Sequence, residues 1–425
     1  MMFEMIQEKI RSLGCDIWEL TETAARGWEF YFIRHELDQN RVTDVKTINV
    51  TLYRPMDGDI LGEASGEISP SASEAEIDKT LADIYFQASL VKNPAYQLND
   101  KPVAAPELQQ VDVAAIAKDF ISAMAAVQET DTEDINSYEI FVKEITRHYL
   151  NSNGVEYTVR YPSSMIEVVV NARSGEHEIE LYRSFHSGTC DPEKLSCDIG
   201  KALSYAKDRL NTEPTPKLNT FDVLFSTIDA VEIYNYFADR MSAGYIFRQI
   251  SDWSIGKPIA DELTGDKLTI KAVSSLQNSS MDYPIDEEGA LIRDRTLISK
   301  GVPENVWGSR QFSQYMGAED SSVVHNFVVE GGKHTEDEVR QGDYLEVVEF
   351  SSFQVDPMGG DIAGEIRLGY LHQNGEVKIV SGGSVSGQMG DVIPTMEFSS
   401  ETEQYDNMVI PRVTLLKGLN ITGIE

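Results

Sequence analysis

Apolar residues recur first at helical and then at strand spacing, and this order occurs twice in the first half of the chain. In the first copy the pattern predicts a helix, three strands and a second helix, over residues 3–13, 28–35, 44–53, 60–68 and 73–92. In the second copy it predicts a helix, four strands and a helix, over residues 111–127, 137–149, 155–161, 165–171, 178–185 and 192–210. The shared order indicates a duplicated unit in which helices flank a β-meander.

Capping residues support the ends of two of these helices. Ser71 or Ser73 can cap the helix over 73–92, and the following Pro94 favours its end. Asp191 and Pro192 suit the N-cap and the first helical position of the helix over 192–210.

The composition changes at two segments that resemble linkers. Residues 99–108 would join the two copies, and the proline-bearing segment 211–219 would end the first half. Beyond it one helix is predicted over 227–241, and short alternating runs follow, including the hairpin signal Asn374-Gly375. We therefore expect an α+β protein with two domains: an N-terminal domain over 1–215, built from units 1–98 and 109–212, and a β-rich antiparallel C-terminal domain over 216–425.

The charge of the chain argues against a nucleic-acid partner. Of its 425 residues, 70 are acidic and 36 basic, which gives a net charge of −34. Such a surface repels phosphate backbones, and no basic cluster offsets it. No apolar run suits a signal peptide or a membrane span, and three cysteines form no C-x-x-C pair. We expect a soluble cytoplasmic protein that binds neither DNA nor membranes.

The segment 285–301 has the most specific pattern in the chain, D-x-E-G followed by T-x-I-x-x-G. Its fixed positions are Asp286, Glu288, Gly289, Thr296, Ile298 and Gly301. Together with Leu13-Gly14-Cys15-Asp16 near the start and the run 415–423 near the end, this pattern resembles the TldD/PmbA family of peptidase-related proteins, once called modulators of DNA gyrase. The resemblance covers nearly the whole chain and is better in the second half.

Members of the TldD type have H-E-x-x-x-H on a helix and a cysteine near the C-terminus, a set that can hold zinc. In the corresponding helix of this chain the two histidine positions fall on Asn235 and Arg240, and Tyr236 stands at the glutamate position. No cysteine follows Cys197. An amide and a guanidinium do not replace imidazole on zinc. The resemblance therefore implies the TldE/PmbA-like branch, whose members lack the metal site and pair with a TldD-type subunit.

Several residues are candidates for a substrate cleft, and each has an ordinary structural alternative. Asp286 and Glu288 could form a carboxylate pair or contact a peptide, or could belong to a solvated turn in which Gly289 has a positive φ. Arg295 could contact a peptide, or pair with a surface carboxylate. The polar face of the helix over 227–241 could line the cleft with Asn235, Asp239 and Arg240, whereas its apolar stripe predicts burial against a sheet.

No catalytic residue is assigned, because no histidine or cysteine has the spacing of a known catalytic motif and no serine follows the G-x-S-x-G pattern. Ser89 and Ser254 fit S-x-x-K with Lys92 and Lys257, but the first lies at the predicted end of a helix and the second has no helical pattern. We expect a subunit without its own zinc or other cofactor, which takes part in proteolysis of unfolded or small peptides. Its catalytic zinc would come from a TldD-type partner in a heterodimer, and a homodimer is the alternative assembly. The alternatives are a self-associating binding or scaffold protein without peptidase activity, and a peptidase with a displaced site.

Overall fold

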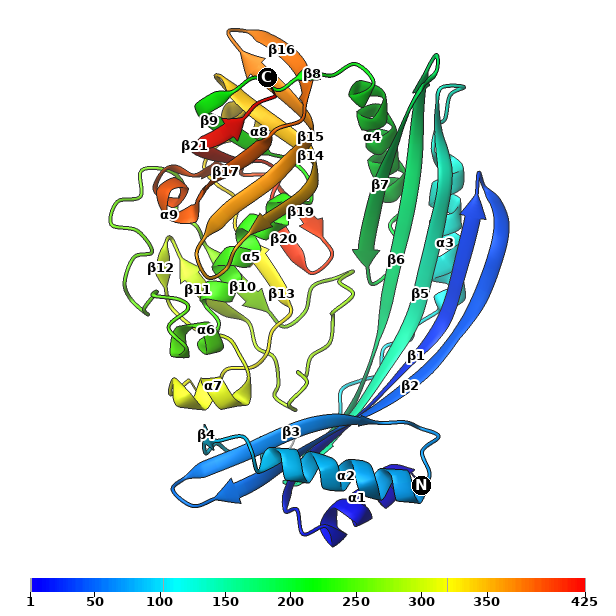
Figure 1. Ribbon diagram of the computed structural model, residues 1–425, viewed down its shortest axis with the longest axis vertical. Helices are drawn as coiled ribbons and strands as arrows, with labels where there is room; N and C mark the ends of the chain where they lie inside the picture. The colour runs from blue at the N-terminus through cyan, green and yellow to red at the C-terminus, as the bar shows by residue number, and fades with distance from the viewer. Residues whose placement is uncertain (1, 102, 319, 425) are drawn as a thin grey trace.

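The computed structural model describes residues 2–101, 103–318 and 320–424. In these residues the N-terminal half forms one antiparallel sheet of seven strands, in the order β4-β3-β2-β1-β5-β6-β7, with four helices (Figure 1). The strands are β1 (Ile17–Ile33), β2 (Glu36–Met56), β3 (Ile60–Ile68), β4 (Asn93–Pro94), β5 (Glu133–Asn151), β6 (Glu156–Ser174) and β7 (His177–Ser187). The helices are α1 (Met2–Ser12), α2 (Glu74–Ala88), α3 (Val113–Ala126) and α4 (Pro192–Arg209).

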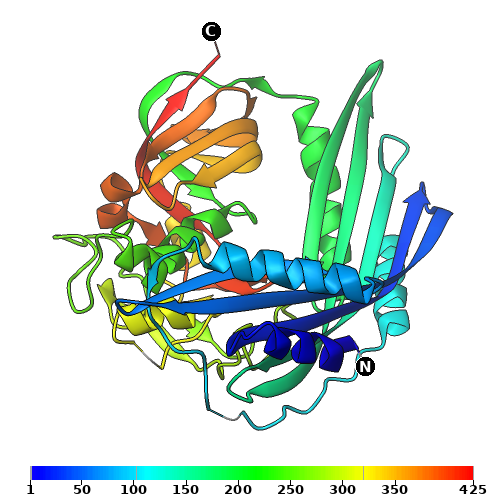
Figure 2. The ribbon, with the colours of Figure 1, turned by 60° about the horizontal axis from the view of Figure 1, so that its bottom comes forward.

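The two predicted copies are joined through their first strands. β1 and β5 pair antiparallel from Glu19 opposite Asn151 to Ile33 opposite Ser137, so the order β3-β2-β1 continues directly into β5-β6-β7. α1 and α2 pack on the first copy and α3 and α4 on the second, each pair over its own apolar core. Figure 2 shows α1 and α2 running beside each other across one end of the sheet, and Figure 1 shows α3 and α4 along its other end. The order of helix, meander and helix is thus present twice.

The strands are longer than the sequence pattern indicates. The two strands predicted over 155–161 and 165–171 are one continuous strand, β6, so the expected four strands of the second copy are wrong. Pro162 lies within β6, opposite Glu144 of β5. β7 pairs with β6 only from Ser164 onward, so the missing N–H of Pro162 leaves no ladder hydrogen bond unmade on that side.

The predicted helix caps are present. Ser73 and Glu76 form a capping box at α2, in which each side chain bonds the backbone N–H of the other. The Asp191 side chain accepts from the backbone N–H of Lys194 at the start of α4. α2 ends at Ala88, before the predicted Lys92.

The C-terminal half contains two sheets in the described residues, as expected for a β-rich part of an α+β fold. One has the order β12-β11-β10-β13-β20-β19, and the other β14-β9-β21-β17-β15-β16-β8. An additional pairing of β14 with β15 closes five strands of the second sheet into a ring. Their bounds are β8 (Glu213–Pro214), β9 (Leu218–Phe225), β10 (Ile270–Val273), β11 (Arg295–Ser299), β12 (Val302–Pro303), β13 (Asn326–Val329), β14 (Tyr344–Val355), β15 (Asp361–Gln373), β16 (Glu376–Ser381), β17 (Ser384–Gln388), β18 (Glu397–Phe398), β19 (Thr402–Tyr405), β20 (Met408–Pro411) and β21 (Thr414–Thr422).

Most pairings of this half are antiparallel, including the β15–β16 hairpin, where Asn374 and Gly375 have φ values of 54° and 79° as its turn signal predicts. Three pairs, β9–β14, β13–β20 and β8–β16, are parallel and join segments far apart in the sequence. The helices are short: α5 (Ala230–Arg240), α6 (Ala243–Phe247), α7 (Arg310–Tyr315), α8 (Glu336–Val339), α9 (Met389–Val392) and a 3₁₀ turn (Ile393–Thr395). None of the helices in the described part of the chain has the length and hydropathy of a membrane-crossing segment.

α5 is packed against β14 and β20. Its apolar stripe, including Ile233, Tyr234 and Phe237, is fully buried, and the Tyr234 hydroxyl is 2.7 Å from that of Thr414. The stripe therefore fixes which face of α5 is left for polar residues.

Candidate functional site

The turn 285–290 is buried at the junction of the two halves. Asp286 is 0% exposed, and its Oδ1 accepts hydrogen bonds from the backbone N–H groups of Glu288 (3.0 Å) and Ala290 (2.7 Å). Its Oδ2 accepts a third from Val323 N (2.9 Å). Burial raises the pKa of Asp286 to about 6, although the three amide bonds act in the opposite direction. Asp286 thus shapes the turn, and a fully solvated turn is excluded.

Residues of the N-terminal sheet hold this turn in place. The Tyr157 hydroxyl donates to the carbonyl of Asp286 (2.5 Å), and Arg147 donates to the carbonyl of Ile285 (2.8 Å). Gly289 has a φ of 79°, and a Cβ there would lie 2.9 Å from Val155 and 3.0 Å from Tyr149. Glycine is therefore favoured both by its backbone conformation and by the close approach of β5 and the turn that follows it.

Glu287, the variable position of the D-x-E-G pattern, is more strongly paired than either neighbour. Arg147 donates to its carboxylate (2.5 Å), as does the Tyr283 hydroxyl (2.8 Å), and a His325 ring nitrogen lies 3.0 Å from it. Burial alone would raise its pKa, but the bonds and charges of His325 and Arg147 lower the pKa to about 2. Sequence reasoning missed Glu287, because its three partners are brought together only by folding.

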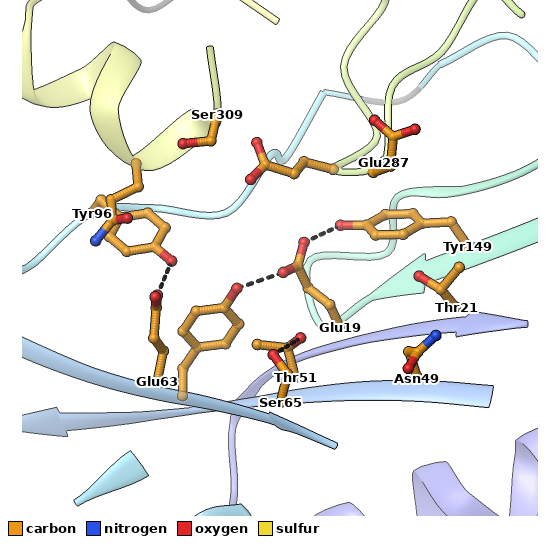
Figure 3. Close-up of a pocket in the computed structure, with 13 residues that line it drawn as sticks. Glu19, Thr21, Asn49, Thr51, Glu63, Ser65, Tyr96, Tyr149, Glu287 and Ser309 are labelled. Carbon is orange, nitrogen blue, oxygen red and sulfur yellow. Dashed lines mark hydrogen bonds between the residues drawn. The ribbon is translucent and has the colours of Figure 1, made fainter. Parts of the chain in front are cut away.

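A polar cavity of about 320 Å³ adjoins the turn. Figure 3 shows tyrosine and glutamate side chains pointing toward one another in it. Tyr53 donates to Glu19 (2.5 Å), Tyr149 donates to the other oxygen of Glu19, and Tyr96 donates to Glu63 (2.5 Å). The lining has no lysine, arginine or histidine; its residues are Glu19, Thr21, Asn49, Thr51, Tyr53, Glu63, Ser65, Tyr96, Tyr149, Glu287, Glu288, Ser309 and Gln311.

Glu288 is a carboxyl group of the lining that can hold a proton near neutral pH. Burial and the neighbouring charge of Asp286 raise its pKa to about 8, against a hydrogen bond from Arg310 N (2.5 Å). Burial also raises the pKa of Glu19. The cavity can therefore store protons and accept hydrogen bonds from an uncharged or cationic polar group.

The candidates on α5 lie on two different faces. Asn235 is hydrogen-bonded to Glu232, and Asp239 shares their face; burial, then the Glu232 charge, raises the pKa of Asp239 to about 6. Arg240 instead lines a second cavity, of about 570 Å³. Its side chain is buried, ion-paired with Asp252, and donates to the carbonyl of Met358 (3.2 Å).

The predicted candidates are thus not brought together at one site. Arg295 lines neither cavity; it donates to the carbonyl of Asp320 (2.5 Å), and burial lowers its pKa. Asp286 and Gly289 build the buried turn, Glu288 lines the polar cavity, and only Arg240 lines the second cavity.

The residues at these positions of α5 do not fit zinc. The Asn235 amide, the phenol of Tyr236 and the guanidinium of Arg240 are not zinc ligands, and the cation repels a divalent metal. In the described parts of the chain no group of three or more histidine, cysteine, aspartate or glutamate side chains is arranged to hold a metal.

A family model described as the PmbA/TldA metallopeptidase C-terminal domain matches residues 219–423. This second half of the chain belongs to the TldD/PmbA family. The match begins at β9 and includes α5 and the turn 285–290. No curated protein matches the chain in sequence.

Solved structures with the same fold extend this likeness to the whole chain. TldE from Thermococcus kodakarensis has a TM-score of 0.76 and 15% identity, covering 99% of this chain and 100% of the other. A candidate modulator of DNA gyrase from Thermotoga maritima has a TM-score of 0.75 and 13% identity, with coverage of 99% and 100%. Another candidate modulator of DNA gyrase, from Bacteroides thetaiotaomicron, has a TM-score of 0.78 and 16% identity, covering 99% of this chain and 98% of the other. At these identities the likeness shows the fold, and the TldD/PmbA fold includes the N-terminal sheet.

Proposed function

We propose that this TldD/PmbA-family chain is a TldE-like subunit, without a zinc site of its own, of a TldD-type metallopeptidase that degrades unfolded or small peptides. The family and the fold, which it shares with a TldE structure, support a peptidase-related role. Arg240 carries the assignment to the metal-free branch, because it places a buried cation on α5 where the resemblance expects a zinc ligand.

The proposal assigns the catalytic zinc and the glutamate that activates its water to a partner chain. A metallopeptidase needs a bound water of lowered pKa and a nearby base in one preorganised site. On α5 the glutamate position is Tyr236, which packs against Phe237 and Trp253 at ring-centroid distances of 5.6 and 5.9 Å. This chain would then supply binding surface to a cytoplasmic heterodimer.

Mixing the chain with an H-E-x-x-x-H family subunit tests this proposal. The chain alone should not cleave an unstructured peptide, and the mixture should cleave it faster than the partner alone and in a chelator-sensitive manner. Cleavage by the chain alone that survives chelator and repeated purification would contradict the subunit role.

A self-associating binding protein is the second candidate, and the free edge of β2 favours it. β3 pairs with β2 only from Ile48 to Met56, so in the described residues the stretch 36–47 has no strand on its outer side. Leu37, Val42 and Val45 are exposed there. Open edges can pair with another chain, but the charges of this edge also oppose such pairing. A Val42→Lys variant that converts a dimer into a monomer, with peptidase stimulation unchanged, would support this candidate.

A further inference from the structure

The second cavity has a buried arginine in its wall whose hydrogen bonds are incomplete. Arg240 is only 6% exposed, and its guanidinium carbon lies 4.9 Å from the ring centroid of Trp253 and 5.4 Å from that of Tyr236. Both rings line the same cavity of about 570 Å³. The aromatic rings fix the plane of the guanidinium, and a planar cation with a fixed orientation is suited to recognising a planar anion.

The side of the guanidinium formed by Nε and Nη2 makes only one of its two possible hydrogen bonds. Nη1 donates to the Met358 carbonyl, and Nη2 donates to Oδ1 of Asp252. Nε is buried and has no hydrogen-bond partner in the described residues. Nε and Nη2 together form the side of the fork that a carboxylate can occupy with two parallel bonds, and Asp252 satisfies only one of the two. An unpaired N–H on a buried cation costs free energy that a second oxygen would recover.

Asp252 is a partner that a ligand can replace. Its side chain is 85% exposed, whereas that of Arg240 is 7% exposed. It lies in a segment without regular secondary structure, between α6 and β10. A solvated carboxylate gains little from such a pair, because water competes for it and its own ordering opposes the bond. Exchange of Asp252 for a ligand carboxylate also keeps the charge of the cavity unchanged.

We propose that Arg240 binds the carboxylate of a peptide through Nε and Nη2, in place of Asp252, and that this carboxylate is the C-terminal one. The lining of this cavity also includes the apolar side chains of Trp253, Ile259 and Ile393, which can contact an apolar last side chain. Asp391 also lines the cavity and repels a second negative charge. The choice of a peptide as ligand rests on the proposed function.

Direct binding to the full chain tests this inference without a partner subunit. The probes are acetyl-Gly-Gly-Leu and the same peptide with a C-terminal amide, titrated by calorimetry. The free acid should bind at least about tenfold more tightly than the amide, because the amide cannot accept two charge-assisted bonds. Equal affinities would overturn the proposal. Tighter binding of acetyl-Gly-Glu-Gly-amide than of the free acid would overturn the C-terminal assignment, since its only carboxylate is on a side chain.

Variants separate Arg240 from other cations. Arg240→Gln should abolish the difference between acid and amide. Arg248→Gln is the matched control, because exposed Arg248 stacks on Phe312 outside the cavity, and this variant should keep the difference. Asp252→Asn should strengthen binding of the free acid by about threefold or more, since it weakens the competing carboxylate.

If Arg240→Gln does not fold, the Asp252→Asn result still decides. Weaker binding of the acid to Asp252→Asn would show that Asp252 assists rather than competes, and would overturn the proposal. Failure of these binding tests leaves stimulation of a zinc-bearing partner unaffected, so the two proposals can fail separately.

Discussion

Tyr157 donates its hydroxyl hydrogen to the backbone carbonyl of Asp286 across 2.5 Å, and this bond ties the N-terminal sheet to the turn of the C-terminal half. The Tyr157 ring is buried and stacked on Tyr149, with 5.2 Å between ring centroids. Two segments separated by more than a hundred residues are thus held by a bond that water does not reach.

Tyr157→Phe should lower the free energy of unfolding by about 1 to 3 kcal/mol, because it leaves a buried carbonyl without a donor. Denaturant unfolding measures the effect. Tyr182→Phe is the control: Tyr182 is 53% exposed and bonds Glu167 at the surface, so its loss should change stability much less. Equal effects of the two substitutions would contradict a special role for the Tyr157 bond.

Gly289→Ala should destabilise the protein more than Gly58→Ala. Both glycines have a positive φ, 79° and 82°, so both substitutions incur the left-handed backbone cost of about 1 to 2 kcal/mol. A Cβ at position 289 would also collide with Val155 and Tyr149, whereas nothing lies within 4 Å of one at position 58. Thermal unfolding of both variants gives the cost of packing a Cβ at position 289, as the difference between their losses of stability. A smaller loss for Gly289→Ala than for Gly58→Ala would show that Val155 and Tyr149 move to make room.

Glu288 should make the protein less stable as the pH rises. In the unfolded chain its carboxyl titrates near 4.5, and in the folded protein at about 8, because burial and Asp286 raise its pKa. Between these values the unfolded chain releases the proton while the folded protein keeps it, so stability is complete below the lower pH and falls toward the higher one. Asp286, at about 6, contributes the same way at lower pH.

Between pH 6.5 and 8.5 the carboxyl of Glu288 loses its proton, whereas that of Asp286 has already lost it. The free energy of unfolding of the wild type should therefore fall by about 1 to 2 kcal/mol over this range, and Glu288→Gln should remove this fall. Denaturant unfolding at several pH values checks this, with substitution of the exposed Glu67 of β3, Glu67→Gln, as the control. The same slope in wild type and Glu288→Gln would assign the pH dependence to another group.

Replacing both Asn235 and Arg240 by histidine should not create a zinc peptidase. Tyr236 still stands at the position of the base, and no cysteine follows Cys197, so metal and water would lack ligands and activation. Elemental analysis and a peptide cleavage assay of the double variant measure this. The unmodified chain should contain no stoichiometric zinc, and about one zinc per chain that is lost when histidines are replaced would contradict the metal-free assignment.

Local patterns in the sequence predicted local structure well. The Ser73 capping box, the Asp191 cap and the Asn374-Gly375 turn are each set by residues within a few positions, so they could be inferred directly. The lengths of the strands could not be inferred in this way. β1 begins at Ile17, far before the predicted start, because threonines and glutamates on its first half hide the alternation. The predicted gap between residues 161 and 165, which contains Pro162, is not a break in β6, and β7 pairs with β6 only from Ser164 onward.

The sites were predicted only in part, because their partners are remote in the sequence. The D-x-E-G pattern located the turn but not its burial, which depends on Arg147 and Tyr157 of the N-terminal sheet. Glu19, at the centre of the polar cavity, lies in a polar run without any motif. Arg240 was identified from the family resemblance, but its incomplete bonding depends on a loop residue, Asp252.

The pairing of β1 with β5 affects how the protein folds while it is being synthesised. Glu19 meets Asn151, so the inner edge of the first copy stays open until more than a hundred further residues have left the ribosome. Such remote pairing is slow, and an unpaired edge is exposed to aggregation meanwhile. The first copy is therefore expected to need protection from aggregation during synthesis, and either copy expressed alone would leave the edge of β1 or β5 unpaired.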